Sequence, residues 1–100
     1  MKCWYFRFEG KFKKGDPTFG CRGLFSSCLV PKNNYRKAES AFLRALNDNE
    51  IDLLKVIECF DIDEEDLDPE DAANTFWIEW CKETIRERKP IFDKWHVFDE

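Results

Sequence analysis

A run of carboxylates at residues 61–71, DIDEEDLDPED, is the stretch of this sequence whose residue types and spacing most suggest chemistry. Eight of its eleven side chains are Asp or Glu, and none carries a positive charge. Carboxylates held this close together repel one another unless water, a cation or a basic partner compensates them. The run could therefore be a metal site, the cap of a helix, or a contact for another protein.

A calcium loop is the first of these candidates, because Asp61, Asp63 and Glu65 match the alternating start of an EF-hand loop. The match then fails at two required positions. Asp66 stands where the sharp turn needs glycine, and Ala72 stands where the bidentate Glu belongs. We therefore expect no metal site and no cofactor.

Part of the run is explained by the start of a helix at residues 69–88. Asp68 can accept hydrogen bonds from free backbone N–H groups, and Pro69 suits the first helical position. Glu70 and Asp71 then lie at the positive end of the helix dipole. The carboxylates left without a structural role are Asp63, Glu64, Glu65 and Asp66. A basic protein would relieve their repulsion, so they are candidate partner contacts.

The apolar residues of the same helix cover an arc of roughly 200°, wider than the stripe of about 100° that one sheet face usually covers. Either the first helix and the last strand of the chain cover the rest, or a partner does. Tryptophan is enriched at interface hot spots. Because Trp77 and Ile78 follow the acidic run directly, we include them among the candidate partner contacts.

Two enzyme motifs are present only in part. Residues 15–22, GDPTFGCR, have the glycine spacing of a phosphate-binding loop, but Cys21 and Arg22 replace its Lys and hydroxyl residue. His96, the single histidine, has no cysteine at a spacing that predicts a nucleophile pair. The five cysteines are odd in number and lack a CxxC pair, which favours reduced thiols over disulfides or zinc ligation.

We therefore expect no catalytic residues and a non-enzymatic role. The alternative is a small enzyme or ligand-binding domain whose site lies in a cleft between the sheet and the helices. The groups that could meet in such a cleft are Glu58, Cys59, Asp93 and His96.

Charge is distributed unevenly along the chain. Residues 1–47 hold ten Lys or Arg against three Asp or Glu, giving +7, whereas residues 48–100 hold six against eighteen, giving −12. Packing of the two halves against each other could neutralise both. A second alternative is nucleic-acid binding by the N-terminal hairpin, where basic residues alternate with aromatic ones. The acidic half would repel the same phosphates, so we do not expect nucleic acid to be the partner.

Periodicity predicts one α+β domain over residues 1–100, with elements in the order ββαβαβ. Strands are expected at 2–13, 23–30, 51–60 and 91–98. A first helix is expected to begin after Asn33 or Asn34 and to end at 47–49. We expect a four-stranded mixed or antiparallel sheet with both helices on one face, in a ferredoxin-like manner.

These features predict a small acidic interaction module that binds a basic protein; an inhibitor or immunity-type antagonist is one form such a module takes. Carboxylates would steer the encounter and aromatic side chains would hold the complex. No apolar run approaches the roughly 20 residues of a membrane span, so we expect a cytoplasmic protein without membrane contact. A homo-oligomer is compatible with this interpretation.

Overall fold

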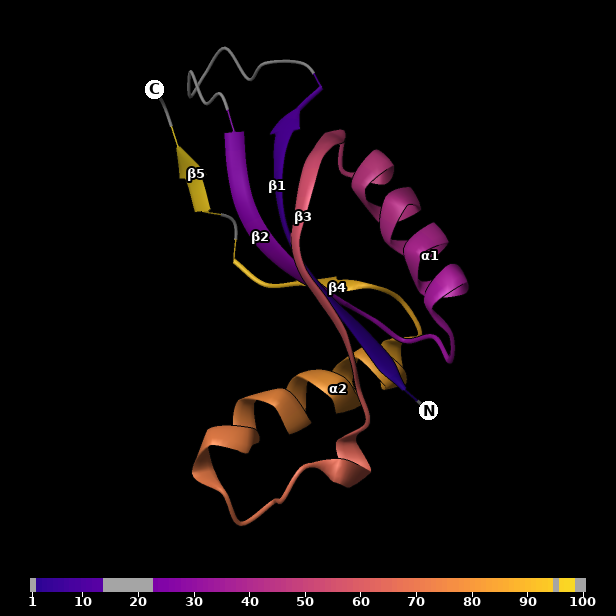
Figure 1. Ribbon diagram of the computed structural model, residues 1–100, viewed down its shortest axis with the longest axis vertical. Coiled ribbons are helices and arrows are strands. Elements are labelled where there is room, and N and C mark those ends of the chain that lie inside the picture. Colours follow the sequence, from indigo (N-terminus) through magenta and orange to yellow (C-terminus); the bar gives the residue numbers. More distant parts are fainter. Residues whose placement is uncertain (1, 14–22, 95, 99–100) are drawn as a thin grey trace.

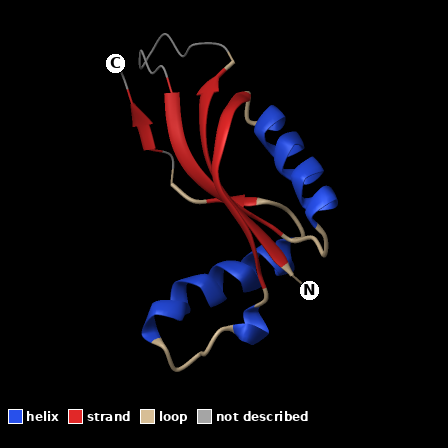
Figure 2. Cartoon of the chain, viewed as in Figure 1, coloured by secondary structure: helices blue, strands red, loops and turns tan. Residues whose placement is uncertain are grey.

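Five strands and two α-helices are present in the computed structural model, which describes residues 2–13, 23–94 and 96–98 (Figures 1 and 2). The strands are β1 (Cys3–Phe12), β2 (Gly23–Val30), β3 (Ile51–Ile62), β4 (Ile91–Phe92) and β5 (His96–Phe98). The helices are α1 (Tyr35–Asp48) and α2 (Thr75–Glu87), with short 3-10 turns η1 (Glu64–Asp66) and η2 (Ala72–Asn74). The α+β class, the first three strands and the first helix confirm the expectation from the sequence.

The sheet is antiparallel, with strand order β3-β1-β2-β4, and β5 also pairs with β2. Strand β1 is central, so that Tyr5 lies opposite Leu29 of β2 and Phe60 of β3. Strand β3 forms one edge of the sheet. This order does not confirm the ferredoxin-like arrangement.

The two helices lie on opposite faces of the sheet, so the expectation that both cover one face was wrong. Phe6 stacks on Phe42 of α1, with ring centroids 4.3 Å apart. Its neighbour Tyr5 contacts Trp77 of α2 edge-on at 5.2 Å. Consecutive residues of a strand point to opposite faces, so these two contacts place the helices on different sides.

Each face of the sheet has its own core, because β1 carries apolar residues at both its odd-numbered and its even-numbered positions. The first core, under α1, is built from Phe6, Phe8, Leu24, Cys28, Val30, Ala38, Phe42, Leu46 and Ile51. The second core, under α2, is built from Cys3, Tyr5, Leu29, Ile62, Trp80 and Cys81. The face expected to be solvent-exposed therefore holds an apolar part at one end of β1.

The other end of that face is charged. Along β1 and β3, Arg7 lies opposite Glu58, Glu9 opposite Lys55, and Lys11 opposite Asp52. Opposite charges at directly facing positions stabilise an antiparallel pair by a few tenths of a kcal/mol, up to about 1 kcal/mol each. Some of the N-terminal basic residues thus lie across from acidic residues within the sheet.

Helix α1 begins and ends as its sequence predicts. The Asn34 side chain accepts a hydrogen bond from the Lys37 N–H at 2.9 Å, which identifies Asn34 as the N-cap. Ala38, Phe42 and Leu46, spaced four residues apart, form its buried stripe. Among the described residues, no helix has the length and apolar character of a membrane span.

Helix α2 begins at Thr75, six residues later than the predicted start at Pro69. The Asp68 side chain accepts from the Glu70 N–H at 2.9 Å, and the Asp71 side chain accepts from the Ala73 N–H at 3.0 Å. Such local turns compete with a helix. No apolar stripe precedes Phe76 to favour the helix by packing, so the turns prevail.

The last strand, expected over 91–98, is divided into β4 and β5. Between them the Ser26 hydroxyl lies 3.4 Å from the Asp93 carbonyl and 3.2 Å from the Lys94 carbonyl, and donates to them. The Asp93 N–H donates to the Ser27 carbonyl at 2.8 Å. Side-chain and backbone bonds from β2 therefore hold the chain at this break.

Candidate functional site: an acidic groove beside α2

The expected acidic contacts lie in and around η1, which contacts α2. Asp63 is half-buried, and its side chain accepts from the Glu65 N–H at 3.1 Å. Glu65 and Asp66 are exposed, whereas the side chain of Glu64 lies outside the described part of the structure. None of Asp63, Glu65 and Asp66 forms an ion pair with another described residue. Asp61, at the start of the acidic run, forms an ion pair with Lys2 at 3.2 Å.

Trp77 and Ile78 are both half-buried. Trp77 packs inward, with its ring 5.2 Å from that of Tyr5 and 6.2 Å from that of Phe60. It therefore belongs mainly to the margin of the second core. The aromatic residue of α2 that protrudes is Phe76, whose side chain is 55% exposed.

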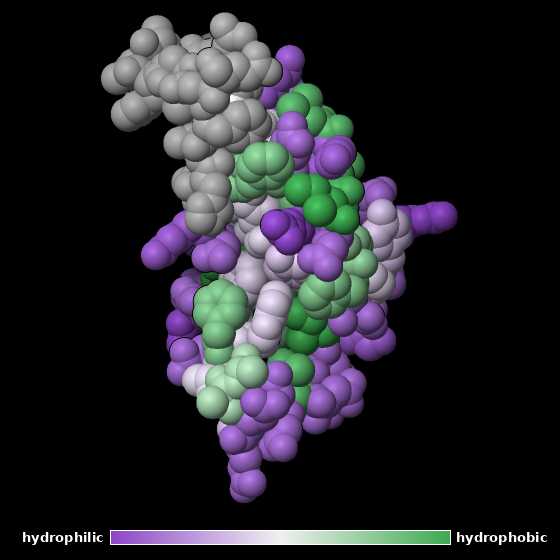
Figure 3. Space-filling model, turned by 60° about the vertical axis from the view of Figure 1, so that its left-hand side comes forward, coloured by the Kyte–Doolittle hydropathy of each residue, from purple (hydrophilic) through white to green (hydrophobic). Residues whose placement is uncertain are grey.

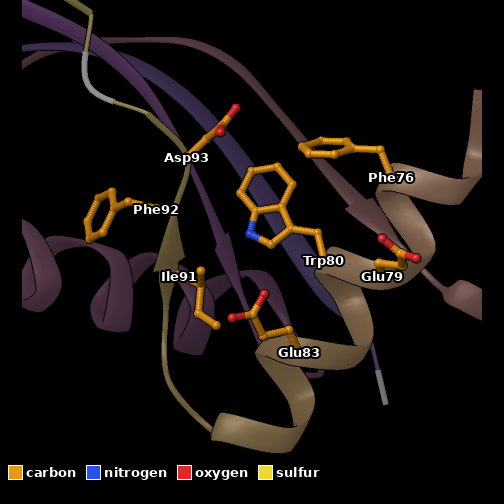
Figure 4. Close-up of a pocket in the computed structure, with 7 residues that line it drawn as sticks. All are labelled: Phe76, Glu79, Trp80, Glu83, Ile91, Phe92 and Asp93. Carbon is orange, nitrogen blue, oxygen red and sulfur yellow. The ribbon is translucent and has the colours of Figure 1, made fainter.

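A groove of about 320 Å³ lies between α2 and the segment of β4, on the flank of α2 that carries Phe76 (Figure 4). The residues that line it are Phe76, Glu79, Trp80, Glu83, Ile91, Phe92 and Asp93. We call it the acidic groove, since three of these residues are carboxylates and none is a base. Figure 4 shows the Trp80 indole in its middle, with Asp93 and Glu83 on either side.

The carboxylates of the acidic groove come from two different elements. Glu79 and Glu83 lie one turn apart on α2, where like charges destabilise a helix by roughly 0.2–0.5 kcal/mol. Asp93 follows β4, and its backbone is fixed by the bond to Ser27. None of the three forms an ion pair with a described residue. A cation bound here would therefore relieve a repulsion that the fold maintains.

Trp80 gives the acidic groove an apolar floor with one hydrogen-bond donor. Its side chain is 7% exposed and stacks near Trp77, with centroids 5.8 Å apart. In Figure 4 the indole nitrogen faces the β4 side of the groove. It donates to no described residue, so the N–H is available to a carbonyl of a bound partner.

The sequence analysis placed the partner contacts of α2 at Trp77 and Ile78, and it missed the residues of α2 that line the acidic groove: Phe76, Glu79, Trp80 and Glu83. Phe76 and Trp80 repeat at the spacing of Glu79 and Glu83, which puts aromatic and acidic residues on one flank of a helix. This i, i+4 spacing of aromatic and acidic residues can be recognised in the sequence alone. Asp93 could not have been added, because its position depends on β4 pairing with β2 next to α2.

Apolar side chains remain exposed elsewhere on the molecule. Figure 3 shows one side with patches of hydrophobic surface in its middle and hydrophilic surface at its lower end. Phe25 and Phe60 are 38% and 39% exposed, respectively. Neither ring lines one of the hollows described here, whereas Phe76 and Trp80 line the acidic groove together with three carboxylates.

The residues proposed for an enzymatic cleft do not come together. Glu58 and Cys59 lie on the edge strand β3, whereas Asp93 follows β4 at the other edge of the sheet. The side chain of His96 lies outside the described part. Within the ranges that the structure describes, no three His, Cys, Asp or Glu side chains converge as a metal site requires.

Four of the cysteines are described: Cys3, Cys28 and Cys81 are buried, and Cys59 is exposed. Burial raises the pKa of the Cys28 thiol far above its usual value, which keeps it neutral and unreactive. Partial burial, followed by the nearby carboxylates of Glu39 and Asp61, also raises the pKa of Cys59. Neither thiol has the lowered pKa of a catalytic nucleophile.

No protein-family model, curated protein or solved structure matches this chain. Its function must therefore be argued from the chemistry of its surfaces.

Proposed function

We propose that this protein is a non-enzymatic interaction module whose acidic groove receives a Lys or Arg side chain of a basic protein. The observation that carries the proposal is the lining of the groove: three carboxylates, an aromatic floor and no base. Unpaired carboxylates around an apolar surface suit a long side chain that has an apolar stem and a cationic end.

The geometry suggests how such a side chain would bind. Its methylene groups would pack across Trp80, and its charged end would lie near Glu83 or near Asp93, which flank the indole on opposite sides. A cation over the Trp80 ring would gain a further 0.5–2 kcal/mol, approximately, from the ring quadrupole. A volume of about 320 Å³ is at the small end for ligand pockets, which suits one or two side chains.

The acidic run has a second role in this proposal. Asp63, Glu65 and Asp66 surround no hollow, so they would act over distance and speed the encounter with a basic partner. Contacts in the acidic groove would instead slow its dissociation. The two parts of the surface should therefore affect different rate constants.

An octa-arginine peptide tests the proposal, with binding kinetics measured on immobilised protein. Glu79→Gln with Glu83→Gln should weaken binding about tenfold or more, mainly through faster dissociation. The matched control, Glu65→Gln with Glu70→Gln, removes the same charge from the acidic run. It should slow association and flatten its salt dependence with little effect on dissociation. Equal losses in both variants would indicate unspecific attraction and overturn the assignment of the groove.

The two alternatives have less support. An enzymatic cleft would require Glu58, Cys59 and Asp93 to meet, and they lie at opposite edges of the sheet. Nucleic-acid binding by the hairpin would require free aromatic faces, and Phe6 and Phe8 are buried under α1. A cytoplasmic location is part of our proposal, because free thiols such as those of Cys28 and Cys59 are typical of a reducing compartment.

A further inference from the structure

A second charged surface lies along α1 and the C-terminal end of α2 and shares no lining residue with the acidic groove. Three hollows of about 250, 200 and 460 Å³ adjoin there, since neighbouring ones share lining residues. We call them together the basic trough. Its charged lining consists of Lys32, Arg36, Lys37, Arg44, Asp48, Arg86, Arg88 and Lys89. Seven cations therefore face one carboxylate.

The cations of the basic trough are not neutralised within the described structure. Arg86 lies 3.7 Å from Glu87, in an exposed pair of little energetic weight. The other six form no ion pair with a described residue. The trough thus gathers positive charge at the surface of a chain whose net charge is −5.

Helix α1 carries its charges against its own dipole. Arg36 and Lys37 lie in its first turn, which contains no acidic residue, and Asp48 ends it. The first turn of a helix favours anions, and the last turn favours cations. An anion bound beside Arg36 would be attracted by both the side chains and the helix terminus.

Arg88 adds an observation that is independent of the charges. It is the C-cap residue of α2 and adopts a left-handed conformation, with φ 56° and ψ 35°. Glycine usually occupies such a position, because it avoids the strain of a side chain there. A long cationic side chain is present here instead, at the junction of two of the hollows.

We propose that the basic trough binds the phosphate backbone of a nucleic-acid duplex. Arg36 and Arg44 are eight residues apart, about 12 Å along α1, a length that corresponds to roughly three to four base-pair steps along the axis of a duplex. No aromatic residue lines the trough. The basic trough would therefore contact the phosphates of a nucleic acid and not stack on its bases. Proteins that bind single strands usually stack bases on aromatic side chains, so the lining of the trough favours a duplex.

This surface differs from the hairpin considered above. Arg7 and Lys11 of the hairpin face Glu58 and Asp52, whereas the basic trough contains Asp48 as its one carboxylate. The inference goes beyond the proposed function and uses other residues. Glu79→Gln with Glu83→Gln should leave duplex binding undiminished, so failure of one proposal does not imply failure of the other.

Fluorescence anisotropy with a labelled duplex DNA of about 20 base pairs tests the inference over salt from about 50 to 200 mM. Arg36→Gln with Arg44→Gln should weaken binding about tenfold or more and reduce the salt slope by about 2. The matched control, Arg7→Gln with Lys11→Gln, removes the same charge and should change both values much less. Equal effects in the two variants would overturn the assignment.

Arg88→Gly separates a binding role from a structural one. The substitution should raise the midpoint of thermal unfolding, because glycine fits the left-handed cap. It should also lower the affinity for the duplex and reduce the salt slope of binding by about 1. Unchanged affinity would remove Arg88 from the site. If polyglutamate displaces the labelled duplex as well as unlabelled duplex does, the partner is an acidic protein and the inference is overturned. Tighter binding of single-stranded DNA than of the duplex would contradict binding through phosphates alone.

Discussion

Tyr5 and Phe6 are consecutive residues of β1, yet their rings belong to two different cores on opposite faces of the sheet. Phe6 lies parallel to Phe42 of α1, with 5° between the ring planes, and Tyr5 meets Trp80 of α2 nearly at right angles, at 85°. One strand thereby couples two helices that do not share a face. The acidic groove and the basic trough depend on this strand for their relative placement.

Leu46 and Leu43 of α1 allow a matched test of the first core. Leu46 is 2% exposed and Leu43 is 44% exposed. Leu46→Ala should lower the free energy of unfolding by about 2–5 kcal/mol, and Leu43→Ala should change it by about 0.5 kcal/mol or less. Chemical denaturation of both variants measures the difference. Similar losses would show that α1 packs through another face.

The same variants test the coupling through β1. Because β1 contributes to both cores, Leu46→Ala should shift the helix signal and the tryptophan signal to one common midpoint. Far-ultraviolet circular dichroism reports the helices, and tryptophan fluorescence in a Trp4→Phe, Trp95→Phe background reports the second core, which contains Trp80 and Trp77. A tryptophan transition that stays at the wild-type midpoint would mean that the two cores unfold independently.

The acidic run should contain two kinds of carboxylate. Asp68 and Asp71 accept backbone hydrogen bonds, so their replacement by Ala should lower the free energy of unfolding by about 1 kcal/mol each, as for other caps. Replacement by Asn keeps the acceptor and should change it less. Asp66 makes no such side-chain bond, and Asp66→Ala should be neutral or slightly stabilising because a repulsive charge is removed. Calorimetric unfolding midpoints compare the variants.

Cys59 should be the reactive thiol among the four that the structure describes. In a Cys21→Ser background, native protein should react with one equivalent of a thiol reagent, and unfolded protein with four. Cys59→Ser should abolish the native reaction. More than one equivalent before unfolding would contradict the burial of Cys3, Cys28 and Cys81.

The pH dependence of that reaction follows from the raised pKa of Cys59. The thiolate is the reacting form, so the rate should keep rising with pH beyond the range of about 8.5 at which an ordinary thiol becomes ionised. Burial is the main cause, and the Glu39 carboxylate adds to it. Glu39→Gln should therefore lower the pKa and increase the rate at mildly alkaline pH; an unchanged rate would contradict the contribution of Glu39.

Elements with strong local signals were predictable from the sequence. The alternation in β1, the cap at Asn34 and the apolar stripe of α1 are each set by residues close together in the chain. The start of α2 was not predictable, because Asp68 offers a cap and a competing turn with the same side chain. Only packing decides between them, and the first residue of α2 whose ring packs on the sheet is Trp77.

The placement of α2 also depended on information that local patterns lack. Cys3 and Tyr5 look like the weaker face of an alternating strand, and nothing near them in the sequence shows that Trp77 and Trp80 will cover them. For the same reason the candidate site was predicted around Asp63 and not between α2 and β4. Asp93 joins Glu83 only through pairing of strands that are distant in sequence.

The indole N–H signal of Trp80 gives the most direct test of the central claim, that the acidic groove receives a cationic side chain. In a two-dimensional ¹⁵N NMR spectrum, Trp80→Phe identifies this signal by its loss. Trp4 provides an internal reference, since its buried indole nitrogen has no described partner and lies in the other core. Titration with octa-arginine should shift the Trp80 signal saturably and leave that of Trp4 in place. A Trp80 signal that does not move while the peptide binds would contradict the claim.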